Sequence, residues 1–217
     1  MDKPGAQLQI PESFLEHRQR FAEPWIERWT TPTVFISPLV SPLRAAGVEL
    51  SDFSFNKDAA NVGDLYLNVA IRRLNAAVRI GLDTVTFIVA NPSWEAAPRL
   101  VAVFDQVSGE IRNVVGASPK SQEATLAFHV SPGSLDFGKI TTSLVSANLV
   151  GNCLFCGVSL HKADGTLLID KSLRYEGAAF VRLQRTFAGD ALFADIAARL
   201  YEDEIAALRL LGLSEIP

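Results

Sequence analysis

Cysteine, histidine and methionine are scarce in this chain of 217 residues, which contains 2 cysteines, 3 histidines and 1 methionine. Cys153 and Cys156 form a CxxC pair, but the surrounding residues predict an apolar strand, which would send the two side chains to opposite faces. A zinc site would use His161 as a third ligand, yet Thr166 stands where the fourth ligand should be. We therefore expect buried structural thiols, with metal or redox work as the alternative, and neither a metal nor another cofactor.

Catalytic signposts are also missing. The sequence contains no GxSxG, HExxH, Walker-type loop or GxGxxG. Isolated histidines such as His17 and His129 are more typical of surface or core positions than of a catalytic pair. The missing motifs exclude only the enzyme classes that carry them. We predict no catalytic residue and favour a noncatalytic protein over an enzyme.

Long apolar runs and long blocks of like charge are absent as well. The densest apolar run, residues 85–90, is far shorter than the roughly 20 residues that span a bilayer, and residues 1–11 lack the apolar core of a signal peptide. We therefore expect a cytoplasmic protein with no membrane partner. The net charge of −4 makes nucleic acid an unlikely partner, although a local basic patch remains possible.

Alternating side chains predict a meander of strands in the first half. The apolar positions alternate with polar ones over residues 65–71, and alternation resumes over residues 74–82 after a turn or bulge at residues 73–76. Residues 85–90 form the most buried strand. Residues 98–115 then show helical spacing, although Gly109 would also suit a hairpin turn, and we favour the helix.

The second half shows the same order. Residues 124–130 alternate as a strand, and residues 135–149 are a weak helix candidate. Residues 153–173 predict a hairpin, in which the Asp164-Gly165 pair accepts a primed turn between Leu160 and Leu167. Residues 179–187 supply another strand. A long amphipathic helix follows, with Asp190 as its N-cap and Gly212 as its stop.

The N-terminal segments are less regular. In residues 11–29 an incomplete apolar pattern and Pro24 predict a short helix, a break and a second turn. Residues 33–37 predict an edge strand, because Pro32, Pro38 and Pro42 surround them and proline cannot donate to a ladder. Residues 48–55 are a further strand candidate.

Both halves thus suggest an internal duplication, residues 64–115 and 152–211, each preceded by a strand at residues 33–37 or 124–130. The predicted fold class is α+β: a mostly antiparallel sheet built from two pseudo-repeated meander-plus-helix units, with the long C-terminal helix packed on the sheet. We divide the chain into an arm (1–30), a first unit (31–116) and a second unit (117–217) within one compact body.

Arginines on the predicted strands are the candidate ligand-binding groups, because their planar forks suit carboxylate or phosphate. The set, with one aromatic residue, is Arg72, Arg79, Arg182, Arg185 and Tyr66. The alternative is that these guanidinium groups simply lie over an exposed sheet face.

Three functions follow, in order of preference. The first is a noncatalytic binding or assembly protein that self-associates or binds a protein partner. The second is an enzyme or sensor that binds a small anionic ligand in the groove between the two predicted units. The third is weak binding of single-stranded nucleic acid through Tyr66 and the arginines.

Overall fold

The computed structural model describes residues 9–31, 33–56, 61–131, 157–211 and 213. The chain divides into two compact units. The major unit comprises Phe14–Ala124 and Thr186–Ala198, and the minor unit comprises Met1–Ser13, Thr125–Arg185 and Arg199–Pro217.

The sheet of the major unit has the strand order β2-β3-β4-β5-β1. Its strands are β1 (Gln9–Arg20, of which residues 14–20 belong to this unit), β2 (Phe53–Phe55), β3 (Leu67–Ile71), β4 (Ala76–Ile80) and β5 (Thr84–Ala90). All four pairings are antiparallel. The predicted meander is therefore confirmed.

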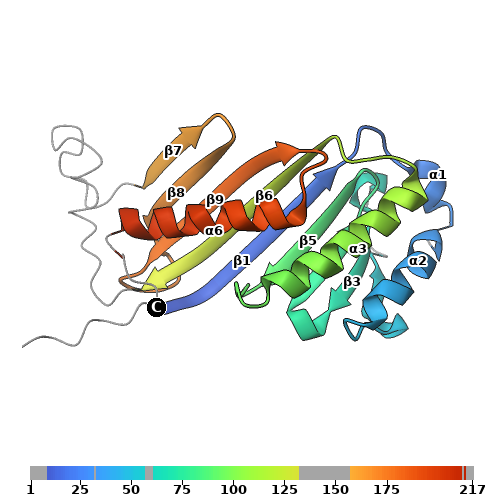
Figure 1. The fold of residues 1–217 in the computed structure, drawn as a ribbon, viewed down its shortest axis with the longest axis horizontal. Coiled ribbons are helices and arrows are strands. Elements are labelled where there is room, and N and C mark those ends of the chain that lie inside the picture. The colour runs from blue at the N-terminus through green and yellow to red at the C-terminus, as the bar shows by residue number, and fades with distance from the viewer. Residues whose placement is uncertain (1–8, 32, 57–60, 132–156, 212, 214–217) are drawn as a thin grey trace, which may run out of the picture. The chain divides into compact units, whose positions relative to one another are not determined.

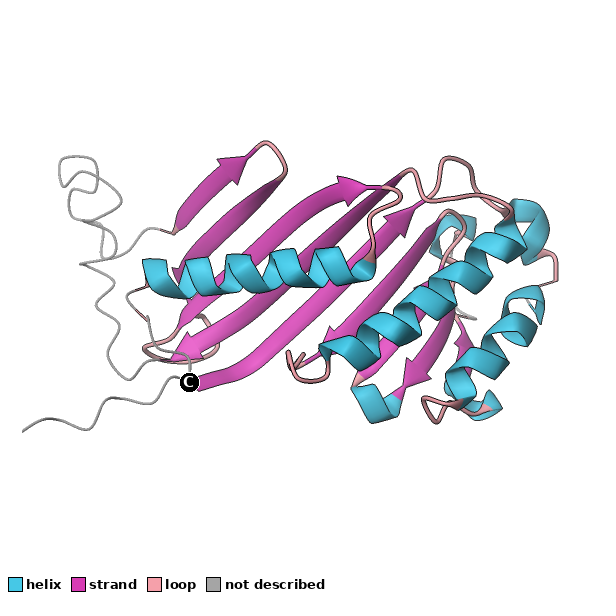
Figure 2. Ribbon diagram, in the orientation of Figure 1, coloured by secondary structure: helices cyan, strands magenta, loops and turns pink. Residues whose placement is uncertain are grey.

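Helices α2 (Thr33–Arg44) and α3 (Ala97–Val115) lie on the same side of these strands and pack against each other (Figures 1 and 2). The core between them and the sheet is apolar and aromatic, with Phe87 contacting Phe104 at a ring-centroid distance of 4.6 Å. The remaining short elements are α1 (Ile26–Trp29) and the 3₁₀ turns Leu50–Asp52, Val62–Asp64 and Arg72–Leu74.

The predicted helix over residues 98–115 is confirmed, and the hairpin alternative is wrong. Leu100, Phe104, Val107 and Ile111 form the buried stripe of α3. The helix ends at Gly116, which has a φ of 71°, a left-handed conformation that glycine adopts without steric cost.

The strand predicted at residues 33–37 is wrong, because this segment begins α2, which contains Pro38 and Pro42. Phe35, Leu39 and Leu43 recur every four residues and are fully buried. An interior proline costs a helix about 3 kcal/mol. Burying a large apolar side chain contributes about 2 to 3 kcal/mol. Three such side chains therefore offset the two prolines.

The helix predicted within residues 11–29 is also wrong over most of its length, because β1 occupies residues 9–20. Its inward positions include His17 and Gln19, which are 2% and 0% exposed. Polar residues at core-facing positions hide the alternation that marks a strand. Two hydrogen bonds hold the Gln19 side chain: it donates to Gln122 at 3.1 Å and accepts from Ser108 at 2.9 Å.

The minor unit has the strand order β6-β9-β8-β7. These strands are β6 (Ser121–Ser131), β7 (Val158–Lys162), β8 (Gly165–Lys171) and β9 (Ala179–Ala188), and the β7–β8 and β8–β9 pairings are antiparallel. The predicted hairpin is confirmed, and Leu160 pairs with Leu167. Its turn lies at Ala163-Asp164, one residue earlier than the predicted Asp164-Gly165, because Lys162 pairs with Gly165, the first residue of β8.

The long C-terminal helix α6 (Phe193–Leu210) packs on the strands, also as predicted. In the minor unit, Leu200, Ala207 and Leu208 are buried together with strand residues such as Val181. The α+β class, the antiparallel sheet and the packed helix are thus confirmed.

The internal duplication is not confirmed. Residues 33–37 lie in a helix, whereas their supposed counterpart, residues 124–130, lies in strand β6. The predictions for Cys153, Cys156 and residues 135–149 concern positions outside the described residues. Among the described helices, none combines the length and the apolar character needed to cross a membrane.

Candidate functional site

Four polar side chains form a row across the uncovered face of the major unit. Strand register pairs Asn68 with Arg79, Arg79 with Thr86, and Thr86 with Arg18. Their sequence neighbours, such as Val78 and Val85, are fully buried beneath the helices. Because side chains alternate along a strand, the row lies on the opposite face of the sheet. Arg18 on β1 and Arg79 on β4 therefore flank Thr86, which lies on the intervening strand β5.

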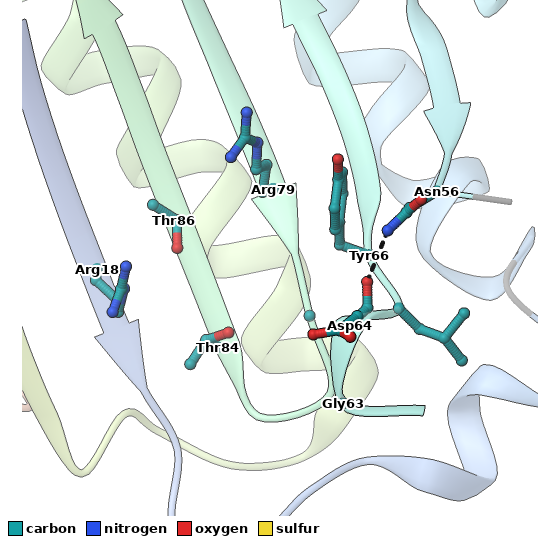
Figure 3. A pocket seen from close by; sticks show the side chains of 10 residues that line it. Arg18, Asn56, Gly63, Asp64, Tyr66, Arg79, Thr84 and Thr86 are labelled. Atoms are coloured by element: carbon teal, nitrogen blue, oxygen red, sulfur yellow. Dashed lines mark hydrogen bonds between the residues drawn. The ribbon is translucent and has the colours of Figure 1, made fainter. Parts of the chain in front are cut away.

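An open hollow of about 560 Å³ lies over this row (Figure 3). Its lining consists of Arg18, Asn56, Gly63, Asp64, Leu65, Tyr66, Arg79, Gly81, Thr84 and Thr86. All ten residues belong to the major unit. The volume is in the range of small-molecule binding sites.

The two arginines of the hollow differ in their partners. The guanidinium of Arg79 lies over the ring of Tyr66 at 5.4 Å from the centroid, and within the described part of the chain it forms no ion pair. Arg18 pairs with Glu16 at 2.7 Å, and their side chains are 42% and 29% exposed. Exposed ion pairs contribute about 0 to 1 kcal/mol, so a ligand can compete with Glu16 at little cost.

Backbone hydrogen bonds fix the end of the hollow that lies beyond the arginine row. The amide of Asn56 donates to the carbonyl of Tyr66 at 3.1 Å, and the Asn56 side chain donates to the carbonyl of Asp64 at 3.0 Å. The amide of Gly81 donates to the carbonyl of Thr84 at 2.8 Å, which closes the β4–β5 turn. These contacts hold Asp64 and Thr84 at one end of the site.

Gly81 packs closely against the Thr84 side chain. A Cβ atom there would lie 2.8 Å from the Thr84 hydroxyl oxygen, closer than real Cβ atoms approach. The Gly81 carbonyl also accepts a hydrogen bond from the indole of Trp29 at 3.2 Å. Hydrogen bonds to Thr84 and Trp29 therefore hold the β4–β5 turn in position.

Two of the sequence-predicted site residues, Tyr66 and Arg79, lie together in the hollow. Arg72 lies elsewhere, in the turn after β3, and donates to Asp52 at 2.9 Å. The pKa of Asp52 is lowered, first by the hydrogen bond from the Glu49 amide and then by Arg72. The structure thus gives Arg72 a local partner.

Arg182 and Arg185 lie on opposite faces of β9 in the minor unit. Arg182 is exposed, whereas Arg185 is 4% exposed and donates to both carboxylate oxygens of Asp203 in α6, at 2.6 and 2.7 Å. Asp164 is a further partner of Arg185. The Asp203 hydrogen bonds are the largest cause of the raised pKa of Arg185. The Arg185 guanidinium therefore links strand β9 to helix α6 through Asp203.

Sequence reasoning missed Arg18, Asp64, Thr84 and Thr86. Arg18 was assigned to a helix, and a correct strand assignment for residues 9–20 would have placed it on the outer face. The threonines stand at alternate positions of β5, which is the one signal that the sequence offered for them. Their grouping with Arg79 depends on strand register, which a single sequence does not give.

Other polar clusters offer no comparable site. His129 is hydrogen-bonded to Ser172 at 3.0 Å, but the Ser172 oxygen also accepts from the amides of Arg174 and Tyr175, so this serine organises a turn. Within the described part of the chain, the ring nitrogens of His161 contact Ser159 and Thr166. The described residues hold no group of three or more His, Cys, Asp or Glu side chains placed for a metal ion.

Comparisons with known proteins do not name a function. The sequence matches no protein-family model and no curated protein. Among solved structures, Methanococcus jannaschii TBP is 12% identical, with a TM-score of 0.31 over 95% of this chain and 98% of that chain. Clostridium acetobutylicum aspartate kinase is 13% identical, with a TM-score of 0.25 over 92% of this chain and 33% of that chain. Similarities this low support no argument about fold or activity.

Proposed function

We propose that this protein is a binding protein for a small anionic ligand, which it takes in the outer-face hollow of the major unit. The observation that carries the proposal is the cross-strand row in which Arg18 and Arg79 flank Thr86. Two guanidinium groups and a hydroxyl then face one open volume.

Charge and hydrogen-bonding capacity both favour an anion at this row. Arg79 has a contact with Tyr66 but no carboxylate partner among the described residues. A guanidinium presents five N–H donors in a planar fork that matches carboxylate and phosphate oxygens. Its contact with the Tyr66 ring orients this fork before any ligand arrives, which lowers the entropic cost of binding.

Binding is better supported than catalysis. Among the described residues, the lining of the hollow contains neither histidine nor cysteine, and Asp64 is its single carboxylate. Within the same residues, neither the Thr84 nor the Thr86 hydroxyl is hydrogen-bonded to this carboxylate, so no nucleophile is paired with a general base there.

Isothermal titration with inorganic phosphate at low salt tests the proposal. The unmodified protein should bind phosphate at one site, and Arg79→Ala should weaken binding at least about tenfold, because a hydrogen bond to a charged group contributes about 1.5 to 3 kcal/mol. Arg182→Ala is the matched control, since Arg182 is also an exposed strand arginine but lies in the minor unit. Equal losses in both variants, or no binding to the unmodified protein, would refute the proposal.

Self-association is a second candidate, which does not compete with ligand binding. Several large apolar side chains are more than half exposed: Ile26, Leu50, Leu173 and Leu192. Burial of such side chains is the usual driving force for association. Single-stranded nucleic acid has less support, because Tyr66 is the one aromatic ring that lines the hollow and Arg79 already covers it.

A further inference from the structure

The hollow of the major unit contains a negative group as well as its two arginines. Asp64 is exposed and lines the same volume, and its carboxylate has one side-chain partner among the described residues, the Asn61 amide at 3.4 Å. That contact is long for a hydrogen bond. The Asp64 carboxylate is therefore available to a ligand.

The positive and negative groups lie at different levels of the sheet. Arg18, Arg79 and Thr86 share one cross-strand row, whereas Thr84 stands two residues earlier on β5, at the end that the Gly81 turn closes. Asp64 lies at this same end, since it precedes β3, whose first residue pairs with the last residue of β4. Two residues of strand correspond to about 7 Å. Figure 3 shows Asp64 beside Thr84, away from the Arg79 guanidinium.

We infer that the ligand is an amino-carboxylate, which places its acidic group at the Arg18–Arg79 row and its ammonium group at Asp64. This inference rests on the proposed function. A ligand with a second acidic group would bring like charges together at Asp64, and an apolar tail would remove water from that carboxylate without pairing it. An ammonium group instead supplies three donors to Asp64 and the Thr84 hydroxyl.

The size of the site fits a short molecule. The levels of Thr84 and Thr86 lie about 7 Å apart along β5, so a ligand that lies along this strand can reach both levels with a chain of a few carbon atoms. A four-carbon probe, 4-aminobutyrate, therefore suits the test. Butyrate lacks its ammonium group, and glutarate replaces that group by a second carboxylate.

Titrations of the full chain with these three probes, followed by backbone amide NMR, give the dissociation constants. We expect 4-aminobutyrate to bind about fivefold more tightly than butyrate, the gain of a favourable exposed ion pair, and glutarate to bind more weakly than 4-aminobutyrate. Asp64→Asn should remove this preference, because it removes the carboxylate that pairs with the ammonium group. Arg79→Ala should weaken both 4-aminobutyrate and butyrate.

The outcomes separate the two proposals. If butyrate and 4-aminobutyrate bind equally and Asp64→Asn changes neither, the amino-carboxylate inference is overturned while the anion site stands. If glutarate binds best, the ligand class is a dianion and the inference is again wrong. If no probe binds and phosphate also fails, both proposals fall together.

Discussion

Burial of His17 in the major unit makes the stability of this protein dependent on pH. The imidazole is 2% exposed and packs against the rings of Phe87 and Phe193, at centroid distances of 5.8 and 4.6 Å. Neither ring nitrogen has a hydrogen-bond partner within the described part of the chain. Burial lowers the pKa of His17 from 6.5 to about 4, and the nearby Gln122 side chain acts in the opposite direction.

The sign of the effect follows from proton binding. Between pH 6.5 and pH 4 the unfolded chain binds a proton at His17 that the folded chain does not, so acid favours unfolding. The stability that neutral His17 provides is complete above about pH 6.5 and is lost as the pH falls toward 4. The gap between the two pKa values corresponds to about 3 kcal/mol in full, of which about 2 kcal/mol is lost by pH 5.

Urea denaturation followed by tryptophan fluorescence at pH 7.5 and pH 5.0 measures this loss. His17→Leu places an apolar side chain of similar size against the rings and cannot be protonated. Its stability should therefore fall about 2 kcal/mol less between the two pH values than that of the unmodified protein. His161→Ala is the control, because His161 is exposed on β7 and should leave the pH dependence unchanged. An identical fall in stability for His17→Leu and the unmodified protein would refute the reasoning.

Two further predictions concern the minor unit and self-association. Asp203→Ala should lower the free energy of unfolding by about 3 kcal/mol in urea denaturation, because it leaves the buried Arg185 guanidinium without its bidentate partner. Glu202→Ala is the control, because it breaks an exposed ion pair with Arg199 on the same helix. A loss below about 1 kcal/mol for Asp203→Ala, or an equal loss for both variants, would contradict the structural role of Asp203. Light scattering on a size-exclusion column should show an oligomer at high concentration, and a strictly monomeric protein would remove the self-association candidate.

The sequence predicted those parts of the fold in which side-chain pattern and burial agree. Val78 and Ile80 alternate with exposed positions on β4, and Leu100 and Phe104 recur at helical spacing on α3. In the minor unit the predicted β7–β8 hairpin forms, with its turn at Ala163-Asp164, one residue earlier than the Asp164-Gly165 pair indicates. In each of these elements the local signal and the tertiary environment favour the same structure.

The errors arose where tertiary contacts override the local signal. β1 buries His17 and Gln19 at its inward positions because Gln122 and Ser108 lie close enough to satisfy the Gln19 side chain, and no pattern within β1 reveals those partners. α2 tolerates two prolines because the side chains of Phe35, Leu39 and Leu43 are fully buried. The site shows the same dependence on tertiary contacts. The residue types alone indicate Tyr66 and Arg79 as candidates, whereas strand register is needed to place Arg18 and Thr86 beside Arg79.

A crystal structure with inorganic phosphate tests the anion site most directly. We expect density for phosphate over Thr86, with its oxygens about 3 Å from guanidinium nitrogens of both Arg18 and Arg79. Phosphate bound elsewhere on the chain, with the hollow containing only water, would contradict the proposal that the hollow binds a small anion.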